Sequence, residues 1–99
     1  MNARATLAQN IIDQRFRLSR YGGRYNLDDV DRLLDALASQ VVAGGNGSEL
    51  ARSAIKSTFR VVPWFREGYL VDDVDDFIDV VVRRLRALPD VEEDNNPGL

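Results

Sequence analysis

The chain has 99 residues and a formal net charge of −3, and it contains no cysteine and no histidine. Without these two residue types the chain has no disulfides, no thiolate zinc site and no histidine general base. A chain of this length is expected to form one small domain with a modest core, not a deep, walled active site.

The chain is a tandem repeat, because two stretches of it recur in order. YNLDDVDRLLD, starting at Tyr25, recurs 44 positions later as YLVDDVDDFID, starting at Tyr69. Upstream, an apolar pattern recurs 43 positions later; its members are Leu7, Ala8, Ile12 and Phe16, then Leu50, Ala51, Ile55 and Phe59. Such self-similarity is typical of a repeated supersecondary unit. We assign residues 1–45 to the first helix-loop-helix unit, 46–89 to the second, and 90–99 to a flexible acidic tail.

The first unit is predicted to fold as helix, loop, helix. Thr6 begins a capping-box pattern for the first helix, which should end near Phe16. The Gly22-Gly23 pair should interrupt the helix, and Asn26, with Asp29 three residues later, should cap the next one. That second helix carries an apolar stripe at helical spacing, made of Val30, Leu33, Leu34, Leu37 and Val41.

The second unit repeats this plan. Ser48 should cap the third helix, and residues 63–68 should form the loop before the fourth. Leu70 stands where Asn26 stood, so the fourth helix should have a weaker cap. Its apolar positions are Val74, Phe77, Ile78, Val81, Leu85 and Leu88. Four amphipathic helices must share their apolar faces, so we expect an all-α, pseudo-symmetric helical domain, formed by one chain or with a second copy.

The sequence also suggests a location. The first ten residues are too polar for a signal-peptide core, and the longest apolar run, Val80 to Val82, is far shorter than a membrane-spanning helix. We therefore expect a cytoplasmic protein that is at most peripheral to the inner membrane.

Two segments carry a motif that is similar to one found in a known protein family. They are RYGGRYNLDDVDRLLDAL, residues 20–37, and WFREGYLVDDVDDFID, residues 64–79. The order of aromatic residue, glycine, tyrosine and acidic helix start resembles the N-terminal domain of the DivIVA family in its actinobacterial form. That family comprises bacterial cell-division and polar-growth scaffolds. The resemblance covers nearly all of residues 7–88 and implies two tandem copies, with structural motif positions at Tyr25, Val30, Leu34, Gly68, Tyr69, Val74, Phe77 and Ile78.

The resemblance implies a contact function. In the family the domain dimerises, and its loop pushes an exposed aromatic residue and an adjacent arginine into anionic membrane. That role would fall here on Phe65 and Arg66, with Trp64 adjoining, and in the first unit on Arg20, Tyr21 and Arg24. The implied partners are the chain itself, with a dimer favoured, a division or polar-growth protein, and an anionic membrane surface. Family scaffolds continue into long coiled coils, which this sequence lacks, so we expect no filament building by the chain alone.

The aromatic pair Trp64-Phe65 has two interpretations. Both rings could sit at a membrane interface, where aromatic residues are favourable. They could instead fold back onto the core, and the small number of other large side chains in the chain favours this second interpretation.

The remaining features predict no chemistry. The DDVD and DDVDD runs lack the spacing of a calcium loop and suit helix starts, so we predict no metal and no cofactor. No nucleophile and base pattern is present, so we predict no catalysis. The alternative function is a small DNA-associated regulator that uses the arginine-rich first unit, although the negative net charge makes nucleic acid an unlikely partner.

Overall fold

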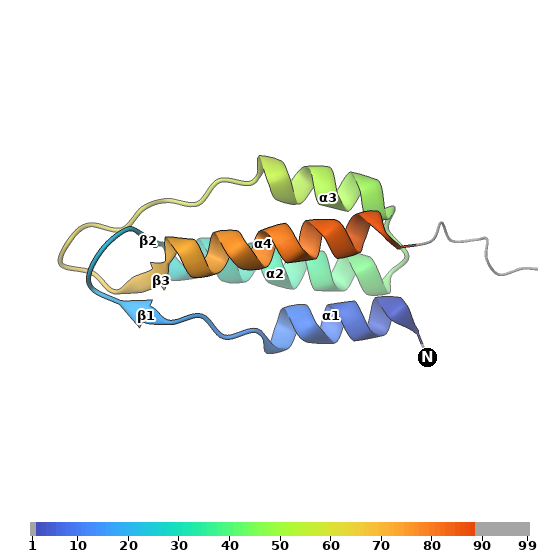
Figure 1. Ribbon diagram of the computed structural model, residues 1–99, viewed down its shortest axis with the longest axis horizontal. Coiled ribbons are helices and arrows are strands. Elements are labelled where there is room, and N and C mark those ends of the chain that lie inside the picture. The colour runs from blue at the N-terminus through green and yellow to red at the C-terminus, as the bar shows by residue number, and fades with distance from the viewer. Residues whose placement is uncertain (1, 89–99) are drawn as a thin grey trace, which may run out of the picture.

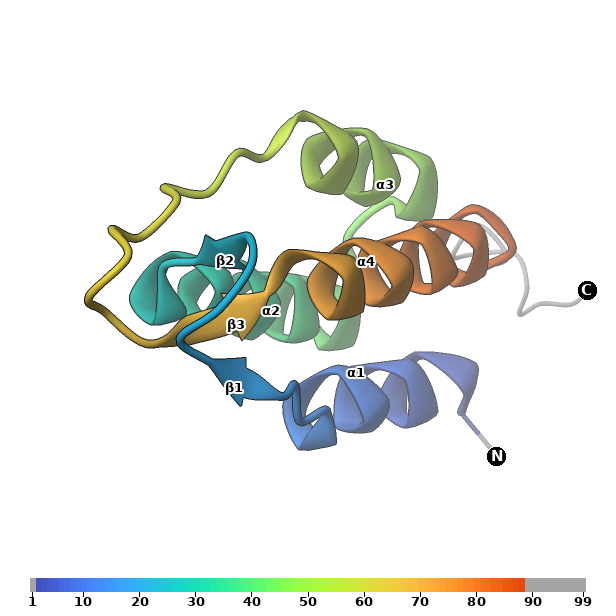
Figure 2. The same ribbon diagram turned by 60° about the vertical axis from the view of Figure 1, so that its left-hand side comes forward.

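A computed structural model describes residues 2–88, which form four helices and one small sheet (Figure 1). The helices lie roughly along one direction, and the strands lie together beyond one end of them (Figures 1 and 2). In chain order the elements are α1 (Ala3–Asp13), β1 (Leu18–Ser19), β2 (Arg24–Tyr25), α2 (Leu27–Val42), α3 (Gly47–Lys56), β3 (Gly68–Leu70) and α4 (Val71–Arg86). The fold is mostly helical, and the all-α prediction was wrong about the sheet. The acidic tail, 90–99, lies outside the described residues.

The sheet is antiparallel and interleaves the two repeat units. Strand β3 of the second unit lies between β1 and β2 of the first. Leu18 and Tyr25 both pair with Tyr69, and an isolated bridge joins Tyr25 to Val61. Extended segments that leave a helix must satisfy their backbone N–H and C=O groups, and the other unit's segment supplies the partners.

A pseudo-two-fold axis therefore passes through the centre of the sheet. Tyr25 and Tyr69 are equivalent in the repeat and are also direct partners in the sheet. The Asn26 N–H donates to the Arg60 carbonyl at 2.7 Å, and the Leu70 N–H donates to the Arg17 carbonyl at 3.2 Å. These two hydrogen bonds occupy equivalent positions of the two units, so each unit makes the same contacts with the other.

The two units share one hydrophobic core. Helix α1 packs on α2 and α3 packs on α4, and one continuous cluster contains buried side chains from all four helices. The predicted stripe of α2 is confirmed, since Val30, Leu34, Leu37 and Val41 are buried and Leu33 packs at the edge. The largest fully buried side chains are Leu7, Ile11, Leu85, Val30, Val41, Val74 and Val81.

The caps at the helix starts match the sequence prediction in part. The Asn26 side chain accepts a hydrogen bond from the Asp29 N–H at 3.0 Å, which confirms the predicted cap of α2. Leu70 provides no side-chain cap for α4, also as predicted. The caps expected at Thr6 and Ser48 were wrong. Asn2 and Asn46 cap α1 and α3 instead; asparagine is a stronger capping residue than threonine and about as strong as serine.

Helix α1 also ends at Asp13, earlier than the predicted end near Phe16. The chain after it is extended as far as the sheet, and the Phe16 ring packs against the core edge with Tyr69 and Phe77. The contact across the repeat units therefore outweighs the local helical pattern.

Two ion pairs join the repeat units reciprocally. The Arg17 side chain binds the Asp73 carboxylate through two nitrogens, at 2.7 and 3.0 Å, and its backbone N–H donates to the same group. Arg60 binds Asp29 in the same way. Each arginine thus anchors its extended segment to the first turn of the other unit's long helix.

Two tyrosines add a second reciprocal pair of contacts. The Tyr25 hydroxyl donates to Asp75 at 2.9 Å, and the Tyr69 hydroxyl donates to Asp31 at 2.8 Å. Burial, followed by the hydrogen bond to Asp31, raises the pKa of Tyr69 to about 12. Both hydroxyls therefore stay protonated and continue to donate throughout the neutral range.

The ion pairs predict a pH dependence of stability. Hydrogen bonds from Arg60 and Arg17 lower the pKa of Asp29 and Asp73 from 3.8 to about 2. A lowered pKa in the folded state stabilises the fold above the unfolded value and loses that contribution as the pH falls through the folded value. The free energy of unfolding should therefore fall between about pH 5 and pH 2, and less steeply in Asp29→Asn with Asp73→Asn.

Urea unfolding at several acidic pH values measures this slope. Asp35→Asn is the matched control, because it removes an exposed carboxylate that has no arginine partner among the described residues. Equal slopes for the wild type and the double variant would contradict the proposed contribution of the ion pairs.

Candidate functional site

Two loops meet at the end of the molecule beyond the sheet (Figures 1 and 2). One connects β1 to β2 and the other precedes β3. We use the name aromatic end for their exposed side chains, Arg20, Tyr21, Trp64, Phe65 and Arg66. Sequence reasoning selected these five residues as contact candidates from two separate segments, and the structure places the two segments at the same end.

The aromatic side chains of this end are exposed. Tyr21 is 83 % exposed, Trp64 82 % and Phe65 58 %. The Trp64 and Phe65 rings contact each other edge to face, with centroids 5.6 Å apart. Packing of these two rings onto the core, which sequence reasoning favoured, was therefore wrong. The rings that pack against the core near the sheet are the pairs Phe16–Tyr69 and Tyr25–Phe59.

The loop that carries Trp64 and Phe65 is a tight turn. Pro63 fixes one backbone angle, and its carbonyl accepts a hydrogen bond from the Arg66 N–H at 2.9 Å. Trp64 and Phe65 are the two central residues of this turn, and both are exposed. Arg20 and Arg66 are exposed and directly adjoin Tyr21 and Phe65 in the sequence, and Glu67 is the one acidic residue of the two loops.

Arg24 has a different role from the one predicted. It was expected to contact a membrane or partner, but it is only 5 % exposed. Its guanidinium donates to the carbonyls of Gly22 in its own loop and of Pro63 and Arg66 in the other loop. Arg24 therefore holds the two loops together and is not available on the surface.

The repeat provides a signal that could have revealed this role. Arg24 is equivalent to Gly68, and the two lie close together beside the pseudo-two-fold axis. A Cβ atom added at Gly68 would lie 2.6 Å from the Tyr25 carbonyl oxygen and 3.0 Å from the Arg24 Cβ. The axis accommodates one large side chain only because its partner position is glycine.

The motif positions expected to be structural lie in or against the core. Gly68, Val30, Leu34 and Val74 are buried, and Tyr25, Tyr69, Phe77 and Ile78 pack against the core cluster. Their packing fixes the sheet and the helices from which the two loops project, and Tyr25, Leu34, Tyr69 and Ile78 also line the two grooves.

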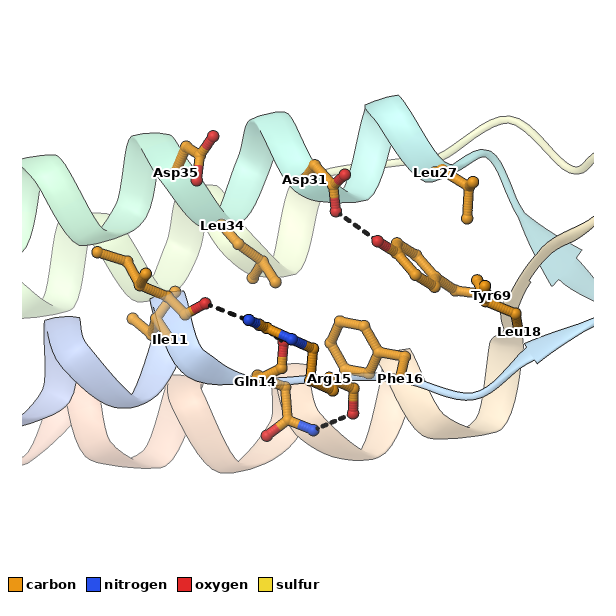
Figure 3. Close-up of a pocket in the computed structure, with 11 residues that line it drawn as sticks. Ile11, Gln14, Arg15, Phe16, Leu18, Leu27, Asp31, Leu34, Asp35 and Tyr69 are labelled. Carbon is orange, nitrogen blue, oxygen red and sulfur yellow. Dashed lines mark hydrogen bonds between the residues drawn. The ribbon is translucent and has the colours of Figure 1, made fainter.

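Two grooves lie along the sides of the helix pairs, away from the aromatic end. The first has a volume of about 460 Å³ and lies between α1, the segment that follows it, and α2 (Figure 3). The second has a volume of about 550 Å³ and lies at the equivalent place in the second unit, between α3, its following segment and α4.

Searches of the described part of the chain found neither a metal site nor a membrane-crossing helix. Among residues 2–88, no three histidine, cysteine, aspartate or glutamate side chains are grouped so that they could hold a metal ion. Over the same residues, no helix combines the length and the apolar character needed to cross a membrane.

Comparisons with known proteins gave no relative from which a function could be transferred. No family model matches the chain, and neither curated proteins nor solved structures gave a match. The class of protein is thus defined by the fold alone, as a small, mostly helical domain made of two units that share one core and an interleaved sheet.

Replacing Arg24 tests its role between the loops. Arg24→Met keeps an unbranched buried side chain but removes all the donors to the loop carbonyls. We expect a loss of about 1–3 kcal/mol in the free energy of unfolding, since buried acceptors lose their partners. Amide hydrogen exchange should become faster across residues 63–68. Arg20→Met is the control, because Arg20 is exposed, and an equal effect of both variants would contradict the role of Arg24.

Proposed function

We propose that this chain is a non-catalytic, DivIVA-like contact module whose aromatic end binds an anionic membrane surface. The observation that carries the proposal is the exposure of Tyr21, Trp64 and Phe65 together at one end, beside Arg20 and Arg66. Large apolar rings are rarely gathered on a surface without a contact to make.

The chemistry of the aromatic end suits a lipid interface. Tryptophan and tyrosine are favoured at the boundary between acyl chains and water, and arginine binds lipid phosphate groups. Burying one such ring contributes about 1.5–3 kcal/mol, and each arginine near an anionic surface adds about 1 kcal/mol. Part of this free energy offsets the translational and rotational freedom that the protein loses on binding, so a single copy should bind weakly and reversibly.

The internal pairing of the units supports this proposal. The resemblance implies that membrane loops of the family come in pairs from a dimer, and here the two units of one chain bring two loops to one end. One chain can then present two loops to a membrane, which in the family requires a dimer of two chains. Self-association remains a proposal beside this one, and light scattering would measure it directly.

The proposal also includes the location and the protein partner that the resemblance implies. In this proposal the chain works at the inner membrane face, with a division or polar-growth protein as its protein partner. The DNA-associated alternative gains no support, because Arg17 is bound to Asp73, Arg24 is buried, and Arg15 donates to carbonyls at the end of α1. The alternative relied on Arg15, Arg17, Arg20 and Arg24 of the first unit, and these contacts leave Arg20 for a phosphate backbone.

Vesicle binding tests the proposal, with Trp64 as a built-in probe because it is the only tryptophan of the chain. Anionic vesicles should shift its fluorescence to shorter wavelength, and neutral vesicles should have a smaller effect. Trp64→Ser with Phe65→Ser should weaken co-sedimentation with anionic vesicles more than about tenfold, because two ring contributions are lost.

The matched control removes two exposed apolar side chains elsewhere. Ile12→Ser with Val42→Ser changes residues that are 54 % and 65 % exposed and lie outside the aromatic end. This variant should bind vesicles as the wild type does. Binding that is equal for all three proteins, or an unshifted Trp64 emission on anionic vesicles, would overturn the membrane proposal.

A further inference from the structure

The groove of the second unit has an apolar floor and an acidic edge. Ala54, Ile55, Phe59 and Ile78 provide the apolar surface, and Ile55 is 54 % exposed although the groove is concave. Asp75 and Asp79 of α4 line the same groove, which has no basic side chain in its lining. The Asp75 carboxylate already accepts a hydrogen bond from the Tyr25 hydroxyl, whereas no side-chain hydrogen bond within residues 2–88 engages the Asp79 carboxylate.

The first groove has the same plan with one difference in charge. It is lined by the equivalent apolar and acidic residues, including Ile12, Leu34, Asp31 and Asp35, and it also contains Arg15 (Figure 3). The repeat places Thr58 where the first unit has Arg15. Two carboxylates and one guanidinium give the first groove a charge of −1, and two carboxylates give the second groove −2.

Arg15 lines the first groove as an exposed residue. Its guanidinium donates to the carbonyls of Ile12, Asp13 and Gln14 at the end of α1, and Figure 3 shows it extending between Gln14 and Leu34. The equivalent end of α3 has Thr58, whose short side chain leaves the second groove open. The two grooves therefore have a similar plan but differ in the charge of the residues that line them.

We infer that the groove of the second unit binds a segment of a partner protein in which apolar side chains alternate with lysine or arginine. Its apolar floor would remove the partner's apolar side chains from water, and Asp75 and Asp79 would attract the flanking cations. An anionic lipid does not fit, because the two carboxylates would repel its phosphate group. The inference does not depend on the membrane proposal, because the groove lies away from the aromatic end.

The test uses the full chain, labelled with ¹⁵N, and a short amphipathic peptide of leucine and lysine. Saturable amide shifts should appear around Ile55, Thr58 and Asp79, with weaker ones around Ile12 and Asp35. A leucine and glutamate peptide tests the charge requirement, and a glycine and lysine peptide tests the apolar one. Neither should saturate the groove.

Exchanging the one charged position between the grooves sharpens the test. Thr58→Arg should weaken peptide binding at the second groove about tenfold, and Arg15→Thr should strengthen binding at the first. Thr6→Arg is the matched control, because it adds the same charge at an exposed position of α1 outside both grooves, and it should bind as the wild type does. The amide spectrum of each variant verifies that it is folded.

Three outcomes would overturn the inference. One is equal binding of the glycine and lysine peptide, which would mean that only net charge attracts the ligand. Another is an equal effect of Thr58→Arg and Thr6→Arg. The third is self-association of the wild type that Thr58→Arg abolishes, since a second copy of the chain would then be the occupant.

Discussion

Reciprocal contact between the two repeat units is the constraint on which the rest of the structure depends. Tyr25 and Tyr69 pair directly in the sheet, and each donates its hydroxyl to an aspartate on the other unit's long helix. The arginine of each extended segment binds the first turn of the same helix. Because every such contact crosses between units, neither half has its own complete set of partners, and the aromatic end forms only when both are in place.

Joining the two units in one chain allows equivalent positions to differ, which a dimer of identical units cannot do. At the axis, Arg24 occupies space that Gly68 leaves free, and it holds both loops. At the loop tips, the second unit has two adjacent aromatic rings, whereas Tyr21 is followed by glycine. In the grooves, the first unit has Arg15 where the second unit has Thr58. The framework stays symmetric because the two units share one core, and the differences lie at the axis, at the loop tips and in the grooves.

Local patterns in the sequence predicted the repeat, the long helices and the Asn26 cap, because each depends on residues a few positions apart. The sheet was missed because strands of two or three residues are too short to show alternation. The Arg17–Asp73 pair joins residues that are 56 positions apart in the sequence, and a local sequence pattern cannot predict a contact between such distant positions. The sequence also could not predict that Trp64 and Phe65 are exposed, because that depends on which aromatic rings pack against the core. The rings that do so beside the sheet are Phe16, Tyr25, Phe59 and Tyr69.

The positions of the two proposed surfaces determine how they can be combined. The aromatic end lies beyond the sheet, at the tip of the molecule, while the grooves lie along the helix pairs behind it (Figures 1 and 3). A chain that stands on a membrane by its tip keeps both sides open to protein partners. The charges follow the same division, with arginines at the tip and aspartates along the second groove, so an anionic surface and a cationic peptide would be attracted to different places. Binding one would therefore leave the other site free, which is the geometry required of an adaptor between a membrane and a basic protein segment.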